Sequence, residues 1–242
     1  MRMSIRAELV SSHDEVWKQL ARPGARLSGA ERVAIAAEVR QARCCAFCKA
    51  RKAALSPNTV RGWHDQADND MPVARVELVH KLTTDPGRIT RSWVDGLIAD
   101  GMEEVEYVEV AGLVSAVIVV DTFHAALGLS LRELPLPVDG TPHGQTPETA
   151  VKEDSYVPMI PVNGLAADYM DLYDNRYFVP NVHRAFSLVP EATRLAATLM
   201  ASHYFPYEMV PRYTNADHSY GINKMQMELV AARVSIYNDC FY

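Results

Sequence analysis

Hydrophobic residues in the first half of the chain recur at helical spacing, and strand patterns are scarce. Ser28 and Glu31 form a capping-box pattern, which opens a helix predicted to run to Leu55. Further helices are predicted over residues 73–83, 89–100 and 102–127. The middle of the last one is apolar nearly all round, which is typical of a buried central helix. The pattern predicts an all-α fold.

The texture of the sequence changes after residue 130. Residues 131–163 hold six of the fourteen prolines, which predicts an extended linker on the surface. Helical periodicity then resumes over 164–173, 181–205 and 223–242. We therefore expect a helical domain over 1–130, a proline-rich linker, and a second helical segment over 164–242.

Composition and charge narrow the class of protein. The chain has 242 residues, of which 48% are hydrophobic, and a net charge of −6, so it can bury a core and has no basic footprint for nucleic acid. Its longest apolar stretch, 110–120, is shorter than the roughly twenty residues that cross a bilayer. The first residues show no secretory signal. We expect a cytoplasmic protein with no nucleic-acid or membrane partner.

Three of the four cysteines, Cys44, Cys45 and Cys48, fall within five residues. On a continuous helix, Cys45 and Cys48 would share a face with Cβ atoms about 5–6 Å apart, beyond the roughly 3.5–4.5 Å of a relaxed disulfide. A bridge there would be strained and easily reduced, as a redox pair requires. Lys49 and Lys52 follow one turn later and are expected to stabilise a thiolate.

Two other interpretations of the cysteines are open. Free cysteine is a good small core residue, so the cluster could be structural. A zinc site needs four ligands, usually as two pairs, and the sequence has one tight cluster. In a reducing compartment, CxxC spacing favours redox use of Cys45 and Cys48. We expect no cofactor and no metal.

Candidate acid–base residues lie near the cysteines and on the central helix. Glu38, two turns before the pair, is a candidate proton-relay carboxylate or an arginine partner. His64 and His80 follow the cysteines and could approach them, but neither lies in a motif. His124, with Asp121 one turn before it, is a candidate acid–base residue or a satisfied core histidine.

An internal similarity links the two ends of the chain. Residues 228–240 align without gaps on residues 33–45, which pairs Cys240 with Cys45. The second copy stops at Tyr242, and a native end, a truncation or a following selenocysteine codon would each explain this. We expect the residues near Cys240 to pack against another subunit or the first repeat.

These residues resemble the alkylhydroperoxidase AhpD / carboxymuconolactone decarboxylase superfamily. The resemblance rests on a CxxC in a helical hairpin with a preceding glutamate, and on the run from Phe123 to Gly128, Phe-His-Ala-Ala-Leu-Gly. It covers 28–129 as one full repeat and 164–242 as a partial second repeat. It implies an AhpD-like helical bundle.

The resemblance also implies roles for single residues. In AhpD-type members the second cysteine of the pair attacks the peroxide and the first resolves it, which implies Cys48 and Cys45 here. Lys52 occupies the position of the relay histidine in the first repeat. Glu228 and Cys240 occupy the relay glutamate and first cysteine positions in the second.

The implied function is a thiol-dependent oxidoreductase that reduces peroxides or disulfides. Its partners would be a peroxide or other small-molecule substrate and an electron-donor thiol system, and the protein would form homo-oligomers. Two alternatives are open. One is a non-catalytic AhpD-like oligomeric scaffold, and the other is a cofactor-independent, decarboxylase-like enzyme with a pocket near His124.

Overall fold

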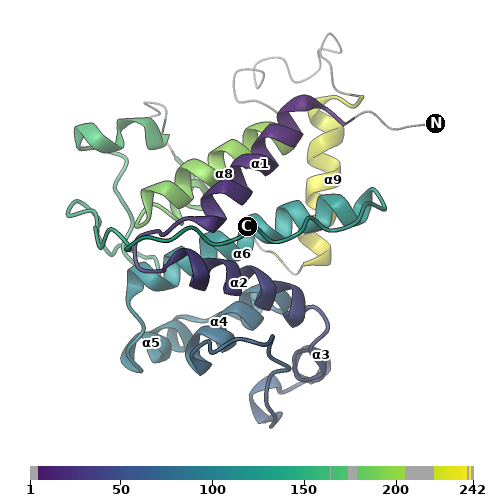
Figure 1. Ribbon diagram of the computed structural model, residues 1–242. Coiled ribbons are helices and arrows are strands. Elements are labelled where there is room, and N and C mark those ends of the chain that lie inside the picture. The colour runs from purple at the N-terminus through teal and green to yellow at the C-terminus, as the bar shows by residue number, and fades with distance from the viewer. Residues whose placement is uncertain (1–4, 164, 174–178, 205–220, 239, 241–242) are drawn as a thin grey trace.

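The computed structural model describes residues 5–163, 165–173, 179–204, 221–238 and 240 (Figure 1). Within these residues the regular structure is helical, apart from one isolated bridge between Val151 and Met159, which confirms the all-α prediction. The α-helices are α1 (Ala7–Ala21), α2 (Gly29–Ala42), α3 (Ala46–Ala53), α4 (Val73–Thr84), α5 (Arg91–Ala99), α6 (Glu104–Ala126), α7 (Asn181–Arg184), α8 (Pro190–His203) and α9 (Lys224–Tyr237). Short 3₁₀ turns span Pro57–Thr59, Pro86–Arg88 and Ala167–Tyr173.

Helix α6 is the buried centre of the fold, as its sequence predicts. It packs against α2 and α4 on one side and α8 on another (Figure 1). Val110, Val117 and Val120 have no exposed surface, so the β-branched run is held in a helix by the surrounding core. Among the described residues, α6 alone is long and apolar enough to span a membrane, and 61% of its most apolar window is buried. A buried core helix can have the same length and hydropathy as a membrane-spanning one.

Two ion pairs fix α2 along α6. Ser28 and Glu31 form the predicted capping box at the start of α2. Arg32 then bonds the buried Glu109 at 2.5 Å. In the last turn of α2, Arg40 donates two 2.9 Å hydrogen bonds to Asp121, which has no exposed surface. A buried carboxylate needs such a partner, so these pairs set the register of α2 on α6.

The single helix predicted from Ser28 to Leu55 is wrong, because the chain breaks between α2 and α3. Cys45 leaves the helical conformation with a ψ of 121°, and its Sγ accepts a hydrogen bond from the Cys48 backbone N–H. Cys45 is therefore the N-cap of α3. The two cysteines lie at an N-cap and one turn into a new helix, rather than on the face of a continuous one.

Residues 131–163 form no helix, and residues 138–144 run along the connection between α1 and α2. The backbone N–H groups of Val138 and His143 donate to the carbonyls of Ala21 and Gly24. Beyond this segment, α8 lies beside α1, and Leu195 and Leu199 share a buried cluster with residues of α1 and α6 (Figure 1). The second helical segment thus shares core with the first. Whether it repeats the same fold stays a prediction.

Helix α9 carries exposed apolar residues, among them Leu229, Val230 and Val234. Cys240 is also exposed in the single chain. Phe241 and Tyr242 lie outside the described residues. Packing of this end against another subunit stays a prediction.

We expect Leu195→Ala to lower the free energy of unfolding by about 2–5 kcal/mol, because it removes buried contacts and leaves a cavity. Chemical denaturation followed by circular dichroism measures the change. Leu136→Ala is the matched control: Leu136 is 88% exposed, and its truncation should change stability by less than about 0.5 kcal/mol. Two separate transitions, with one alone shifted by Leu195→Ala, would contradict a core shared between α8, α1 and α6.

Candidate thiol site

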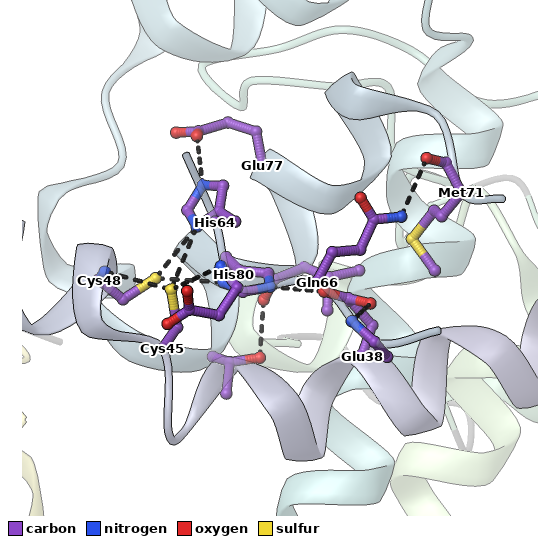
Figure 2. A network of polar contacts seen from close by, with 12 residues as sticks. Glu38, Cys45, Cys48, His64, Gln66, Met71, Glu77 and His80 are labelled. Carbon is purple, nitrogen blue, oxygen red and sulfur yellow. Dashed lines mark hydrogen bonds and ion pairs between the residues drawn. The ribbon is translucent and has the colours of Figure 1, made fainter. Parts of the chain in front are cut away.

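Four side chains converge beside the start of α3. The Sγ atoms of Cys45 and Cys48 and the Nδ1 atoms of His64 and His80 all lie within 4.8 Å of one another (Figure 2). The Cys48 Sγ lies 3.2 Å from His80 Nδ1 and 3.4 Å from His64 Nδ1, and the Cys45 Sγ lies 3.7 Å from His64 Nδ1. Both cysteines are free thiols and buried. The predicted pair therefore exists, and two histidines complete it.

Three parts of the chain bring these residues together. Cys45 and Cys48 come from the break before α3, His80 from α4, and His64 from the segment that joins these helices. The Cys45 Sγ accepts backbone N–H bonds from Cys48 at 3.5 Å and Asp65 at 3.4 Å. One donor belongs to the first turn of α3 and the other to the joining segment, so the sulfur is held from two sides. These bonds tie the joining segment to α3.

A buried carboxylate orients His80. Glu38 Oε1 lies 2.6 Å from His80 Nε2, and neither side chain has exposed surface. Glu38 Oε2 accepts two further bonds, from the Ala67 N–H and the Asn69 amide. Burial raises the pKa of Glu38, but the bonds from His80, Asn69 and Ala67 lower it below its ordinary value. A carboxylate only accepts, so His80 Nε2 carries a proton and Nδ1 faces Cys48.

His64 is oriented in the same way by a second carboxylate. Glu77 Oε2 lies 2.7 Å from His64 Nε2, and Glu77 also accepts two bonds from Arg51, at 2.8 and 2.9 Å. Figure 2 shows Glu77 on the side of the His64 ring away from the sulfur atoms. Each imidazole therefore presents Nδ1 to the sulfurs and Nε2 to a carboxylate.

The hydrogen bonds shift the pKa values of the site in opposite directions. Burial raises the pKa of the Cys48 thiol, but bonds with His64, His80 and Thr84 outweigh it and lower the pKa to about 6. Burial lowers the pKa of each histidine, but bonds to Cys48 and to a carboxylate raise the pKa of His64 to about 10 and of His80 to about 9. The reduced, metal-free site therefore holds a thiolate beside imidazolium groups near neutral pH.

The lysines expected to stabilise the thiolate point elsewhere. Lys52 Nζ donates to the Thr84 carbonyl and Lys49 Nζ to the Cys44 carbonyl, both in exposed positions. The sequence alone favours these lysines because they lie one helical turn beyond the cysteines. The break at Cys45 changes that geometry, and the cationic groups at the sulfurs come from histidines. Glu38, by contrast, lies in the site as expected, with a histidine rather than an arginine as its partner.

The sequence indicates that His64 and His80 could approach the cysteines but assigns them no role, and nothing in it points to Glu77 or Asp65. One signal was available: fifteen residues separate Cys48 from His64, and fifteen separate His64 from His80. The gap from the CxxC to His64 is that of zinc sites, but their second histidine follows after about three to five residues, so His80 does not fit the pattern. Glu77 had no such signal, because its partner His64 lies outside any helix.

The remaining predicted site residues lie outside this cluster. His124 Nδ1 lies 2.8 Å from the Ser130 carbonyl oxygen, and Asp121, expected to orient it, bonds Arg40 instead. Glu228 forms an ion pair with Lys224 on α9. Cys240 is exposed. None of the three belongs to the group of sulfur and imidazole ligands found in the described part of the chain.

The decarboxylase-like alternative requires a polar pocket lined by His124. One cavity in the described part of the chain lies around Arg32 and Glu109, another lies around Arg194, and His124 lines neither. His124 instead lies near the ring of His13, whose Nε2 is 2.8 Å from His203 Nε2. This histidine group packs α1 against the ends of α6 and α8.

No family model, curated protein or solved structure matches the chain. The fold and the site therefore define the class on their own: an all-α protein with a buried pair of cysteines, each within reach of histidine.

Burial lowers the pKa of His13 to about 4, and the positive charges of His203, His124 and Arg132 act in the same direction, against Asp14. Between pH 6.5 and 4 the unfolded chain binds a proton that folded His13 does not, so stability falls as pH falls through this window. We expect the thermal midpoint of the wild type to drop from pH 6.5 to 4. His13→Asn should flatten that drop.

Differential scanning calorimetry at several pH values measures this slope. His143→Asn, a change at a partly exposed histidine outside the group, is the control and should keep the wild-type slope. Equal slopes in wild type and His13→Asn would show that the folded protein does not hold His13 neutral.

Proposed function

We propose that the protein is a thiol-dependent oxidoreductase of the alkylhydroperoxidase type, which reduces small peroxides through Cys48 and Cys45. The observation that carries the proposal is the placement of two unbridged cysteine sulfurs beside two imidazoles, each backed by a carboxylate. The resemblance to the AhpD / carboxymuconolactone decarboxylase superfamily is part of this proposal.

The reaction has two steps on the protein. The Cys48 thiolate attacks one peroxide oxygen, an S–O bond forms as the O–O bond breaks, and the departing alkoxide takes a proton to become an alcohol. Cys45 then attacks the sulfur of the Cys48 sulfenic acid, the S–S bond forms, and hydroxide leaves as water after taking a proton. The two thiols lose two electrons in total. An external dithiol returns them by thiol–disulfide exchange and becomes oxidised itself.

Geometry supports Cys48 as the attacking residue. Its Sγ contacts both His64 and His80, and the residue is 5% exposed, whereas Cys45 has no exposed surface. An attacking sulfur needs both a proton donor for the leaving oxygen and a path for the oxidant. Cys45, held by two backbone N–H groups behind it, is suited to the resolving role.

Glu38 and His80 are suited to supply the proton relay that Lys52 does not provide. His80 bonds the sulfur through Nδ1 and the carboxylate through Nε2, so the imidazolium can give its Nδ1 proton to the alkoxide while Glu38 holds the ring in place. Glu38 and His80 would thus take the relay roles, although the family resemblance places the relay histidine at Lys52.

Burial of both thiols limits the oxidant. A small peroxide needs less opening of the site than a protein disulfide does. Buried thiols are also consistent with the alternative of a non-catalytic scaffold, whose site has no turnover. The electron-donor thiol system, the homo-oligomer and the cytoplasmic location stay predictions from the sequence.

We expect mild hydrogen peroxide to link Cys45 to Cys48 in the metal-free protein, because their sulfurs lie in one cluster. Peptide mass spectrometry after rapid alkylation detects the bridge. Cys48→Ser should abolish the linkage. Cys44→Ser, at the exposed neighbouring cysteine, is the matched control and should leave it unchanged.

Two outcomes of that experiment contradict parts of the proposal. A bridge between Cys44 and Cys48 would show that the resolving cysteine is assigned wrongly. Thiols that remain reduced until the protein is denatured would sink the oxidoreductase proposal and favour the scaffold.

We expect His80→Asn to slow peroxide consumption by at least about 10²-fold, the size of a typical general acid–base contribution. The variant removes the ring nitrogen that contacts Cys48 and keeps a polar group near Glu38. The initial rate with a small dithiol as reductant measures the effect, and His143→Asn should match the wild type. A His80→Asn rate equal to that of the wild type would exclude the proposed relay.

A further inference from the structure

We infer that the reduced protein binds one zinc ion through Cys45 Sγ, Cys48 Sγ, His64 Nδ1 and His80 Nδ1. This inference goes beyond the proposed redox function and stands on the geometry of the ligands alone. It revises the sequence-based expectation that excluded a metal, because the two histidines supply the second pair of ligands that the sequence seemed to lack.

The four ligand atoms have the spacing of a tetrahedral zinc site. Zn–S bonds of about 2.3 Å and Zn–N bonds of about 2.0–2.1 Å at tetrahedral angles place neighbouring ligand atoms roughly 3.3–3.8 Å apart. The sulfur-to-nitrogen distances of 3.4 and 3.7 Å fall in this range, the third, 3.2 Å, lies just below it, and every pair of ligand atoms lies within 4.8 Å. An ion at their centre requires only small side-chain adjustments.

The outer contacts are those that zinc-binding histidines make. A metal-ligating imidazole almost always donates its other ring N–H to a carboxylate or carbonyl, which fixes the ring and its tautomer. His80 does so with Glu38 at 2.6 Å, and His64 does so with Glu77 at 2.7 Å. Both rings therefore turn the same nitrogen, Nδ1, toward the cysteines.

Charge and the cysteine environment fit the same ion. Two thiolates balance the two positive charges of zinc when both histidines are neutral, so the filled site adds no net charge to a buried region. The Cys45 sulfur also accepts two backbone N–H bonds, which stabilise an anionic ligand. Cysteine and histidine together are the ligand set of structural zinc sites.

The ion would connect three otherwise separate parts of the chain: the start of α3, the joining segment at His64, and α4. Four protein ligands close the coordination sphere, which is the arrangement of a structural rather than a catalytic zinc. Zinc bound there also occupies the sulfur lone pairs that peroxide chemistry needs. Under the proposed function, zinc would therefore protect the reduced thiols.

The test uses reduced, metal-free full-length protein titrated with Zn²⁺ in competition with a chromophoric chelator. We expect one ion per chain, and Co²⁺ should give the intense visible bands of tetrahedral coordination together with thiolate-to-metal charge transfer. Cys48→Ser and His80→Asn should each lose this binding. Cys44→Ser and Cys240→Ser, at the exposed cysteines, are matched controls and should bind as the wild type does.

A second variant separates ligand geometry from loss of fold. Glu77→Gln keeps all four ligands and should weaken zinc binding about 10–100-fold, the usual cost of losing the carboxylate behind a ligating histidine. Circular dichroism verifies that each variant retains its helices. Weak, octahedral Co²⁺ bands in the wild type, or Zn²⁺ binding to Cys48→Ser as tight as to the wild type, would overturn the inference.

Failure of this proposal can be distinguished from failure of the redox proposal. The disulfide and peroxide assays use metal-free protein, so they report on thiol chemistry whether or not zinc binds. Zinc binding is read from the metal alone and needs no turnover.

Discussion

The contact between Glu38 and His80 is the interaction on which the site depends. Both side chains have no exposed surface, and a charge placed there without partners would be strongly unfavourable. Glu38 therefore accepts three hydrogen bonds, from His80, Ala67 and Asn69. These bonds tie α2 to α4 and hold the joining segment over the cysteines. Removing one partner of such a buried pair typically costs about 3–5 kcal/mol.

From that contact the rest of the site follows outward. His80, with its Nε2 directed at Glu38, has Nδ1 directed at Cys48, and the joining segment brings His64 to the other side of the same sulfur. Arg51 and Glu77 repeat the arrangement at the surface side of His64. Positive and negative groups thus alternate from Arg51 inward. The same alternation serves thiol chemistry and metal binding, because both require sulfur anions with oriented imidazoles beside them.

Local patterns in the sequence predicted the fold well. Helices α4 and α6 and the capping box at Ser28 depend on residues that are neighbours in the sequence. These features can therefore be predicted from the sequence alone. The break at Cys45 cannot be predicted in this way, because its sulfur is held by the N–H of Asp65, twenty positions later. Convergence of His64 and His80 on the cysteines depends on how α3 and α4 pack, which the spacing of these residues along the chain does not determine. Glu38 was found because it lies two helical turns from the cysteines, although its partner was not.

The protonation of His80 in the reduced, metal-free protein tests the central claim most directly. Long-range ¹H–¹⁵N NMR near neutral pH distinguishes a proton on Nε2 from one on Nδ1. The account predicts an imidazolium with protons on both ring nitrogens, of which the Nε2 proton is in slow exchange and shifted downfield by its short bond to Glu38. An imidazole protonated on Nδ1 alone would mean that Glu38 does not orient the ring, and it would contradict the account.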